Sequence, residues 1–585
     1  MQIEPLVKRE SLDDAKETNH SSKRVKTEKN PVSIAMKSET NKWWENKEVE
    51  EENDNPNIKW IDLEHNGVIF PEPFKTEGVT VDYKGEAVKL SNFQEEIAVY
   101  WVQSIGGEWE NKTHYRENFK ELFLNSFEGT TLLDKHKELD FDGFSFDNVK
   151  RMVERNKELK SQQTKEERKK LKEIKDKREE KYKNAIVDGR LEKLSNFRIE
   201  PRGLFKGRGD HPKAGTLKQL TKPEDIKLNC STRALVPICP LPGRCWGDIL
   251  NNKESSWLAS YDESCTGNKK YVFLGAGSKI KGKKDMMKYE KARQLKDKIG
   301  GIREDYNVKM RNDQERVRQL ATAAYLIDFL AIRVGNEKKE DEADTVGCCS
   351  LRVEHIRFEE DNKITLDFLG KDSMQYLNTV KIDVQAYQNL KVFTANKQPN
   401  EDIFNLINSS KLNEYLQSLM EGLTAKVFRT YNASMTLQKE LNKVAETMKP
   451  TDPVEKKLDA YELANRRVAI LCNHQKGVSK NFDEVSEKQA QKIEDMKKEM
   501  RQLKKNKETG KYNKMKERVA KAEKQLEKRI QNKSVALNTS KINYNDPRIS
   551  VSWCKSMSMP IEKIFTSVLL EKFVWAMPTT SVWKF

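Results

Sequence analysis

The sequence predicts an α+β protein with several domains, and three observations support this class. With 585 residues the chain is too long for one hydrophobic core. Some stretches alternate apolar and polar residues around short turns, which indicates β-hairpins, while others place apolar residues at helical spacing. Two charged stretches near the C-terminus repeat apolar residues as a coiled coil does. We therefore expect mixed, mainly helical and coiled-coil parts in one chain.

The composition favours a polyanionic partner. Lys and Arg number 108 and Asp and Glu 92, so the net charge is +16, which suits nucleic acid or an acidic membrane surface. No apolar run approaches the ~20 residues of a membrane span, and no secretory signal opens the chain. The eight cysteines form no C-x-x-C pair, and none lies at metal spacing with a histidine. We expect a reducing compartment, no metal site and no membrane partner.

The N-terminal residues 1–41 are polar and lack periodicity, so we expect a disordered tail. Within this tail, Lys23-Arg24-Val25-Lys26 has the form of a nuclear localisation signal, which predicts a location in the nucleus. From Lys42-Trp43-Trp44 onward the composition becomes globular.

The next elements are a hairpin and charged helices. Residues 79–90 predict a β-hairpin around Lys84-Gly85. Residues 91–148 predict a small helical layer, and 149–185 one or two long helices with charges on most faces. Such a run of charges favours a solvated helix over direct binding.

Two glycine-rich segments follow. Residues 198–213 interleave glycines with cations, which suits a loop docked on phosphates, but ordinary surface loops share this composition, so both interpretations stay open. Strand-like segments continue to about 275. Gly277–Lys284 resembles a phosphate-binding P-loop, yet Lys284 stands where Ser or Thr must hold magnesium. We therefore expect no nucleotide cofactor and interpret this segment as a flexible hinge before a long helix.

The middle of the chain carries several candidate cations. Residues 286–334 predict helix, with Arg333 in the last turn and Gly335 as the C-terminal cap. A second β-hairpin over 364–382 puts Lys371 at an exposed turn.

Two further candidates lie at helix ends. Arg429 is at or near a helix start, and His474 ends a helix that stops near Gly477. A lone histidine in such a place is more often a capping or core residue than a catalyst.

The coiled-coil stretch has a physical use. Residues 484–533 predict two helical arms around Lys507–Gly510, and an antiparallel hairpin returns the chain to its starting point. Tyr544 can therefore meet His474 in space. Because Asn, Asp and Pro surround Tyr544, it should lie on a loop or turn. A helix opened by Pro560 should then pack onto the preceding domain and hold this loop.

Five of these residues form a set suited to phosphodiester cleavage without a metal ion: Arg333, Lys371, Arg429, His474 and Tyr544. Ionising a phenol of pKa ~10 at neutral pH costs ~4 kcal/mol. Two guanidinium groups and an imidazole can neutralise and orient the charged oxygens of the attacked phosphate, and a lysine can protonate the leaving alkoxide. A phosphotyrosine keeps the energy of the broken bond, so resealing needs no ATP.

The sequence resembles the eukaryotic type IB DNA topoisomerases from about Lys42 to Ala576. The blocks that carry the resemblance are Lys42-Trp-Trp-Glu, Phe205-Lys-Gly-Arg-Gly-Asp-His-Pro-Lys-Ala-Gly, Ile332-Arg-Val-Gly-Asn-Glu-Lys, Asp344-Thr-Val-Gly-Cys-Cys-Ser-Leu-Arg-Val-Glu-His, Phe368-Leu-Gly-Lys-Asp-Ser, Lys426-Val-Phe-Arg-Thr-Tyr-Asn-Ala-Ser, Ile470-Leu-Cys-Asn-His-Gln and Ser540-Lys-Ile-Asn-Tyr-Asn-Asp-Pro-Arg. So many long blocks in one order do not recur by chance.

The resemblance implies a clamp around double-stranded DNA, built by a monomer. It implies a mixed cap over 42–278, a mainly helical catalytic domain like that of tyrosine recombinases over 279–477, a coiled-coil linker over 478–533 and a C-terminal domain over 534–585. These four domains follow the N-terminal tail, residues 1–41.

The resemblance also implies roles for single residues. Tyr544 would be the nucleophile that forms a 3′-phosphotyrosine, Lys371 the general acid, and Arg333, Arg429 and His474 the groups that hold the phosphate. Four residues match positions near the cleavage site and are expected to contact DNA: Arg208, Lys270, Asp372 and Asn543. Because Asn543 and Asp372 match positions linked to drug response, camptothecin-type poisoning is implied too.

The chain departs from the family pattern in a short N-terminal tail and in the end Met577–Phe585, which lacks the acidic finish common in relatives. Two other functions remain as alternatives. A site-specific tyrosine recombinase shares the residue logic but needs a defined DNA site and a synaptic oligomer. A non-enzymatic basic DNA-binding scaffold would use the coiled coil for assembly.

Overall fold

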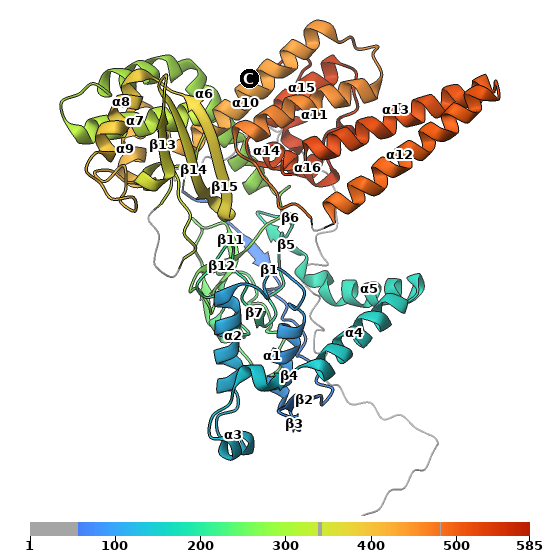
Figure 1. Cartoon of the computed structure of the whole chain (residues 1–585). Coiled ribbons are helices and arrows are strands. Elements are labelled where there is room, and N and C mark those ends of the chain that lie inside the picture. Colours follow the sequence, from blue (N-terminus) through green and yellow to red (C-terminus); the bar gives the residue numbers. More distant parts are fainter. Residues whose placement is uncertain (1–56, 337–341, 480) are drawn as a thin grey trace, which may run out of the picture. The chain divides into compact units, whose positions relative to one another are not determined.

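The computed structural model describes residues 57–336, 342–479 and 481–585. It is a mixed α/β structure in which several small sheets accompany many helices, as the sequence predicts (Figure 1). The predicted tail 1–41, its signal Lys23–Lys26 and the block that begins at Lys42 lie outside the described residues.

The first predicted hairpin is confirmed. β2 (Thr80–Tyr83) and β3 (Glu86–Lys89) pair antiparallel, and β4 (Phe144–Ser145) joins the other edge of β2. Lys84 and Gly85 have φ values of 51° and 89°. Two successive left-handed residues make a turn whose twist matches that of the strands, so the lysine tolerates its conformation here.

Helices pack beside this sheet around an aromatic core. They are α1 (Asn92–Val102), α2 (Thr113–Asn125), α3 (Thr131–His136) and α4 (Asp147–Gln162), while α5 (Lys165–Glu179) follows α4 and contributes no residue to this core. The rings of Trp101 and Phe119 stack at 4.6 Å between centroids in this core. α5 buries Glu179 alone among its residues, which confirms the prediction of a solvated charged helix for this stretch.

A second group of strands forms three sheets, and the two larger ones share a core of their own. The strands are β1 (Leu63–His65), β5 (Asn184–Val187), β6 (Arg190–Lys193), β7 (Gly203–Leu204), β8 (Leu217–Lys218), β9 (Lys227–Asn229), β10 (Asp248–Leu250), β11 (Trp257–Asp262) and β12 (Lys269–Phe273). Their orders are β1-β5-β6, β7-β8 and β10-β9-β11-β12. Between β6 and β9 the chain is largely irregular, as expected for the glycine-rich residues 198–213.

The predicted hinge before the long helix is wrong. α6 (Lys279–Lys309) begins directly after Ser278, whose hydroxyl accepts a hydrogen bond from the backbone N–H of Lys281 at 3.4 Å. Such a serine cap starts a helix, and Gly282 near the start of this helix is tolerated and buried. The segment that resembles a P-loop is therefore mostly the first turns of a helix.

The predicted end of the next helix is also wrong. α7 (Glu315–Leu330) stops where Ala331 takes the left-handed conformation with φ 50°, so Arg333 lies beyond the helix and Gly335 is not its cap. Gly335 has another role: a Cβ there would lie 2.8 Å from the backbone nitrogen of Gly347. The glycine permits this close approach of two chain segments.

The second predicted hairpin is confirmed. β14 (Lys363–Gly370) pairs antiparallel with β15 (Met374–Lys381) across a tight turn, and β13 (Ile356–Glu359) pairs with the other side of β14. The turn contains Lys371, which is exposed, and Asp372, whose φ is 68°. It therefore presents two charged side chains at one end of the sheet.

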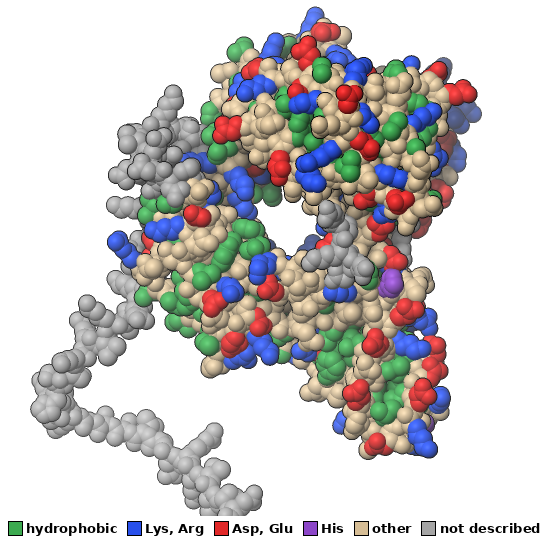
Figure 2. Space-filling model, turned by 90° about the vertical axis from the view of Figure 1, so that its left-hand side faces the viewer, with side chains coloured by type: hydrophobic (Ala, Val, Ile, Leu, Met, Phe, Trp, Pro, Cys, Tyr) green, Lys and Arg blue, Asp and Glu red, His purple; other side chains and the backbone are tan. Residues whose placement is uncertain are grey.

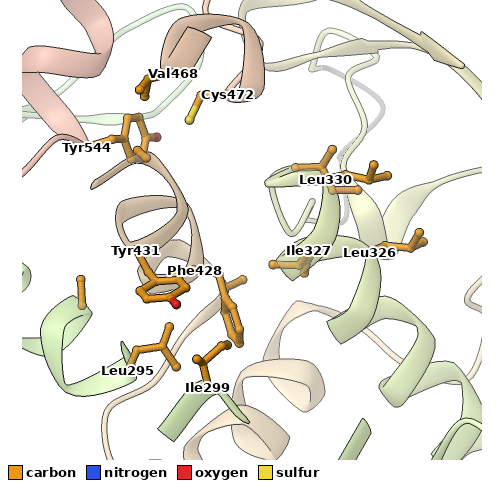
Figure 3. Close-up of a cluster of buried hydrophobic side chains, with 14 of the residues drawn as sticks. Leu295, Ile299, Leu326, Ile327, Leu330, Phe428, Tyr431, Val468, Cys472 and Tyr544 are labelled. Carbon is orange, nitrogen blue, oxygen red and sulfur yellow. The ribbon is translucent and has the colours of Figure 1, made fainter. Parts of the chain in front are cut away.

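The largest hydrophobic core lies among the central and C-terminal helices. Besides α6 and α7, this part contains α8 (Val384–Thr394), α9 (Ser409–Leu419), α10 (Ala425–Thr447) and α11 (Val454–Leu471). Figure 3 shows how Leu295 and Ile299 of α6, Ile327 of α7 and Phe428 of α10 face one another. Arg429 is the neighbour of Phe428, which confirms its expected place near a helix start.

Two long helices form the predicted antiparallel hairpin (Figure 1). α12 (Phe482–Lys505) and α13 (Thr509–Gln531) run side by side and are joined by a short turn. Their shared core contains the buried Ile493, Met515 and Val519. Ile530, which the heptad spacing also assigns to the core, is 55% exposed.

The C-terminal residues form short helices instead of the predicted long one. They are α14 (Leu537–Asn543), α15 (Pro547–Ser556) and α16 (Ser567–Lys572), with the 3₁₀ turns η8 (Ile561–Lys563) and η9 (Val574–Ala576). The predicted apolar face after Pro560 is therefore broken: Ile564, Phe565 and Leu569 are buried, whereas Val568 is 63% exposed. α15 was not predicted.

In the part of the chain that the structure describes, no helix combines the length and the apolar character needed to span a membrane. Lys and Arg side chains are interspersed with Asp and Glu over the face shown in Figure 2.

Candidate active site

Tyr544 lies between two short helices and is largely buried. It follows α14, and Asp546 caps α15 by accepting a hydrogen bond from the backbone N–H of Arg548 at 3.0 Å. The sequence Asn-Asp-Pro breaks the helix here, because Pro547 fits the first position of a helix but not its interior. The expectation that Tyr544 occupies a turn is confirmed, and only 9% of this residue is exposed.

Three of the candidate residues surround the side chain of Tyr544. Its ring stacks on the imidazole of His474 with 5.2 Å between centroids, and the guanidinium of Arg429 lies 5.0 Å from the ring centre. The guanidinium of Arg333 lies close enough to the phenol for the two groups to interact electrostatically. Figure 3 shows Tyr544 beside Cys472, which ends α11. The prediction that the helical hairpin returns Tyr544 to His474 is therefore confirmed.

Arg429 is held by the ends of two helices. It is 3% exposed and donates hydrogen bonds to the carbonyl oxygens of Ala331 and Cys472, the latter at 2.9 Å. These residues follow the last turns of α7 and α11, where carbonyl groups lack helical partners and carry partial negative charge. The two helix ends compensate the buried cation and fix its orientation. Its Nε has no protein partner among the described residues.

His474 is neutral in this structure. The residue is 4% exposed, and burial, followed by the charges of Arg429 and Arg333, lowers its pKa to about 3. Its Nδ1 lies 2.8 Å from the hydroxyl of Ser540, while its Nε2 has no partner among the described residues. If Ser540 donates to Nδ1, the proton of the neutral ring lies on Nε2, which is then available as a donor.

Arg333 lies on a non-helical segment that the following chain holds in place. The backbone N–H of Cys348 donates to the carbonyl of Arg333 at 2.8 Å, and that of Cys349 to the carbonyl of Val334 at 2.6 Å. Burial and the charge of Arg429 lower the pKa of Arg333 from its usual high value. All eight cysteines of the chain are free.

A cavity of about 110 Å³ joins four of the five candidates. Arg333, Lys371, Arg429 and His474 all line it, whereas Tyr544 is not among its lining residues and lies against Arg429 and His474. Lys371 reaches this cavity from the exposed β14–β15 turn. Three cationic side chains, a neutral imidazole and the carboxylate of Asp372 therefore line the cavity.

A wider cavity of about 550 Å³ lies next to the first and shares Arg333, Lys371 and Asp372 with it. Arg208 and Lys270 also line this second cavity, so three of the four predicted DNA-contacting residues lie there together. Arg208 forms an ion pair with Asp372, and Lys270 lies 3.5 Å from a carboxylate oxygen of Glu200.

Asn543 is the predicted DNA-contacting residue that lines neither cavity. It is the exposed last residue of α14, its side chain donates to the carbonyl of Thr539 at 3.3 Å, and its own carbonyl accepts a hydrogen bond from Lys288 at 3.2 Å. It therefore adjoins the catalytic tyrosine candidate through the chain and not through the cavities.

Two buried serines were not predicted. Ser540 positions the imidazole of His474, and Ser434 bridges the tyrosine turn by donating to the carbonyl of Tyr544 at 3.1 Å and accepting from the N–H of Asp546 at 3.0 Å. Ser540 lies in the same sequence block as Tyr544, and Ser434 ends the block that contains Arg429. Their place in these blocks was the one signal that could have identified them, because nothing in the sequence distinguishes these two serines from other serines.

Within residues 57–336, 342–479 and 481–585, no group of three or more His, Cys, Asp or Glu side chains is arranged to hold a metal ion.

Family models match most of the chain. Residues 58–274 match the DNA-binding fragment of eukaryotic DNA topoisomerase I, residues 277–508 its catalytic core, and residues 516–585 a C-terminal topoisomerase domain. Together these models describe an enzyme that acts on DNA.

Curated relatives agree with these models. The chain is 42% identical over 564 residues to DNA topoisomerase 1 of Caenorhabditis elegans, covering 92% of this chain and 68% of that protein. It is 40% identical over 556 residues to DNA topoisomerase 1 of Homo sapiens, covering 90% and 72%. DNA topoisomerase 1 beta of Arabidopsis thaliana is 41% identical over 554 residues, and the chain spans 59% of its length. The chain belongs to the eukaryotic DNA topoisomerase I family, which consists of isomerases of type IB.

Proposed function

We propose that this chain relaxes supercoiled double-stranded DNA by cutting one strand, letting the duplex rotate and resealing the cut, with Tyr544 as the nucleophile. One observation carries the proposal: His474 and Arg429 lie against the ring of Tyr544, at 5.2 Å between ring centroids and 5.0 Å from the guanidinium to the ring centre, and Arg333 lies near the phenol. An ordinary buried tyrosine has no need of two guanidinium groups and an imidazole beside it.

Cleavage follows from these groups. The phenolic oxygen of Tyr544 attacks the phosphorus, the bond from phosphorus to the 5′ oxygen breaks, and the tyrosine is left joined to the 3′ phosphate. The phenol proton is lost to solvent and Lys371 gives a proton to the departing 5′ oxygen. A guanidinium beside the attacking oxygen stabilises the negative charge that spreads over the phosphate and the phenol oxygen in the transition state.

Arg333, Arg429 and the Nε2 of His474 hold the non-bridging oxygens of the phosphate. Arg429 suits this role because its Nε has no protein partner while helix-end carbonyls fix the rest of the guanidinium. Groups that are already oriented lose little on binding and stabilise the added charge of the transition state. A neutral His474 donates one hydrogen bond without adding a third cation beside the two arginines.

Resealing runs backwards through the same site. The phosphotyrosine stores the energy of the broken bond, so the free 5′ hydroxyl can attack it and release Tyr544. Neither ATP nor a metal ion is required by this sequence of steps.

The DNA duplex is proposed to lie in a clamp that a monomer forms. Arg208, Lys270 and Asp372 are proposed to contact DNA near the cut, which is supported by their position along the cavity next to the cleavage residues. Asn543 is proposed to do the same from the side of Tyr544.

The division into a cap over 42–278, a catalytic domain over 279–477, a linker over 478–533 and a C-terminal domain over 534–585 is part of this proposal. So are the coiled-coil nature of the linker, poisoning by camptothecin-type drugs, and a location in the nucleus of the cell.

Plasmid relaxation in EDTA without ATP tests the function directly. The parent chain should relax a plasmid that has no defined target site, and Tyr544→Phe should abolish relaxation while DNA binding stays within about twofold, because the phenol supplies the bond-forming oxygen and not the affinity. Tyr512→Phe on α13 is the matched control and should relax the plasmid normally. Relaxation by Tyr544→Phe would refute the assignment, and a requirement for a defined site would favour a recombinase.

A further inference from the structure

A fully buried carboxylate lies two residues after Tyr544 and needs a partner. Asp546 has 0% exposure, and burial raises the pKa of its carboxyl group. Arg548 opposes that shift with a two-pronged contact: its Nη2 donates to one carboxylate oxygen at 2.7 Å and its Nε to the other at 3.0 Å. An ionised carboxylate is kept at this depth only by such a pairing.

Aromatic rings from the last part of the chain surround Arg548. Its guanidinium carbon lies 4.6 Å from the ring centre of Trp583 and 5.6 Å from that of Trp575. Glu290 of α6 accepts a hydrogen bond from its remaining nitrogen. Cations lie favourably against indole rings, and a planar guanidinium held this way keeps its orientation.

The residues around Trp583 are themselves tied to the core. The carbonyl of Trp583 accepts a hydrogen bond from the hydroxyl of Ser552 at 2.8 Å. The backbone of Phe585 donates to Gln438 at 3.2 Å and its carbonyl accepts from Lys296 at 2.6 Å, while its side chain is 2% exposed. Trp583 therefore has a fixed place and is not a loose surface residue.

The contacts continue from Asp546 to the tyrosine. The backbone N–H of Asp546 donates to the hydroxyl of Ser434, and that hydroxyl donates to the carbonyl of Tyr544. A change in the position of Asp546 therefore moves the backbone that carries the phenol.

We infer that Trp583 is a positioning residue for the cleavage reaction, acting on Tyr544 through Arg548, Asp546 and Ser434. The inference rests on the proposed role of Tyr544. It gives a role to the residues Met577–Phe585, because an indole of this segment orients an arginine.

The test compares Trp583→Ala with Val582→Ala, because Val582 is the neighbouring residue and is 80% exposed. Single-turnover cleavage at saturating DNA should slow about tenfold in Trp583→Ala, the effect of losing a partly buried cation–π contact. DNA affinity, measured in the Tyr544→Phe background so that no cleavage occurs, should stay unchanged. Trp583→Phe, which keeps an aromatic face, should restore most of the rate.

Arg548→Lys changes the other partner of the same cation–π contact. It replaces Trp583→Ala as the test if that variant does not fold. Lysine keeps the charge but loses the fork and the planar stack, so cleavage should slow to a similar degree with unchanged affinity. Equal cleavage rates in Trp583→Ala, Arg548→Lys and Val582→Ala would overturn the inference, as would a loss of affinity as large as the loss of rate. A parent chain that forms no covalent adduct would instead refute the proposed function.

Discussion

The buried imidazole of His474 links the active site to the stability of the fold. Its pKa is lowered to about 3, whereas an unfolded histidine has its ordinary value of 6.5. Between these values the unfolded chain binds a proton that the folded chain does not, so stability falls as pH is lowered through this window. His65 adds to the same effect, since burial lowers its pKa to about 4.

Replacing His474 by Gln should therefore flatten the pH dependence of stability. Glutamine keeps a hydrogen-bonding side chain but takes up no proton, so the loss of unfolding free energy between roughly pH 6.5 and pH 4 should shrink. Urea denaturation across this range measures it, with His65→Gln as the comparison. An unchanged slope in His474→Gln would show that the imidazole is not held neutral.

Lys371 is proposed as the general acid, so the effect of removing it on the cleavage rate should depend on whether the leaving group needs a proton. Lys371→Ala should slow cleavage of ordinary DNA by about 10²–10⁴-fold, the usual contribution of a general acid. A 5′ thiolate leaves without a proton, so a substrate with sulfur at the bridging 5′ position should largely rescue the variant. If both substrates lose the same factor, Lys371 acts in another way.

The sequence predicted which charged residues belong to the candidate site, but it did not predict the serines that hold them in place. Arg333, Arg429 and His474 could be selected because each stands in a sequence block that resembles the family, whereas a histidine at a helix end is by itself more often structural. Ser434 could not, because its role depends on the distances to two backbone groups of the tyrosine turn, 110 and 112 residues away in sequence.

The helical hairpin of α12 and α13 is an element whose stability depends on a small core. Ile493 is 4% exposed within it, whereas Ile530 is 55% exposed. Charged side chains on the surface of α13 form ion pairs with α11, such as Lys528 with Glu462 at 2.7 Å. Exposed pairs of this kind contribute little, so the apolar seam should determine how often the hairpin opens.

Ile493→Ala should weaken this hairpin while Ile530→Ala should not. Removing a buried isoleucine typically costs about 2–4 kcal/mol, whereas an exposed one costs a fraction of that. Amide hydrogen exchange in α12 and α13 should accelerate in Ile493→Ala, with exchange in α6 and α10 unchanged. Equal acceleration in both variants would mean that the seam does not hold the arms together.

Element boundaries were the weakest part of the sequence prediction. The spacing of apolar residues identified α12 and α13 but not the end of α7, because Ala331 adopts a left-handed conformation that alanine rarely takes. Arg429 bonds to the carbonyl that this ending exposes. The helix stops where the site needs it, which local propensity does not encode.

For the whole molecule, the excess of 16 positive charges predicts strongly salt-dependent DNA binding. The slope of log affinity against log salt concentration is negative, and it becomes steeper by about 0.9 for each phosphate that the protein neutralises. Arg208→Gln should therefore make the slope shallower by about one, because Arg208 lines the cavity next to the cleavage residues. Lys563→Gln in η8, which is exposed and lines neither cavity, should leave the slope unchanged.

An identical salt slope for parent and Arg208→Gln would remove Arg208 from the DNA interface. The sequence could place Arg208 on a glycine-rich loop but could not show that this loop meets the turn at Asp372, 164 residues further on. The contact between this loop and this turn depends on tertiary packing. The family resemblance implied only that both residues lie near the cleavage site, and the structure adds the ion pair between them.

The covalent bond between protein and DNA tests the central claim most directly. The reaction is quenched with denaturant on a duplex labelled at one end, and the DNA-linked peptide is then identified by mass spectrometry. The linkage should map to Tyr544 and join it to the 3′ phosphate, so that the strand end released free carries a 5′ hydroxyl. A linkage to another residue, or the absence of any adduct from a chain that relaxes DNA, would contradict the account.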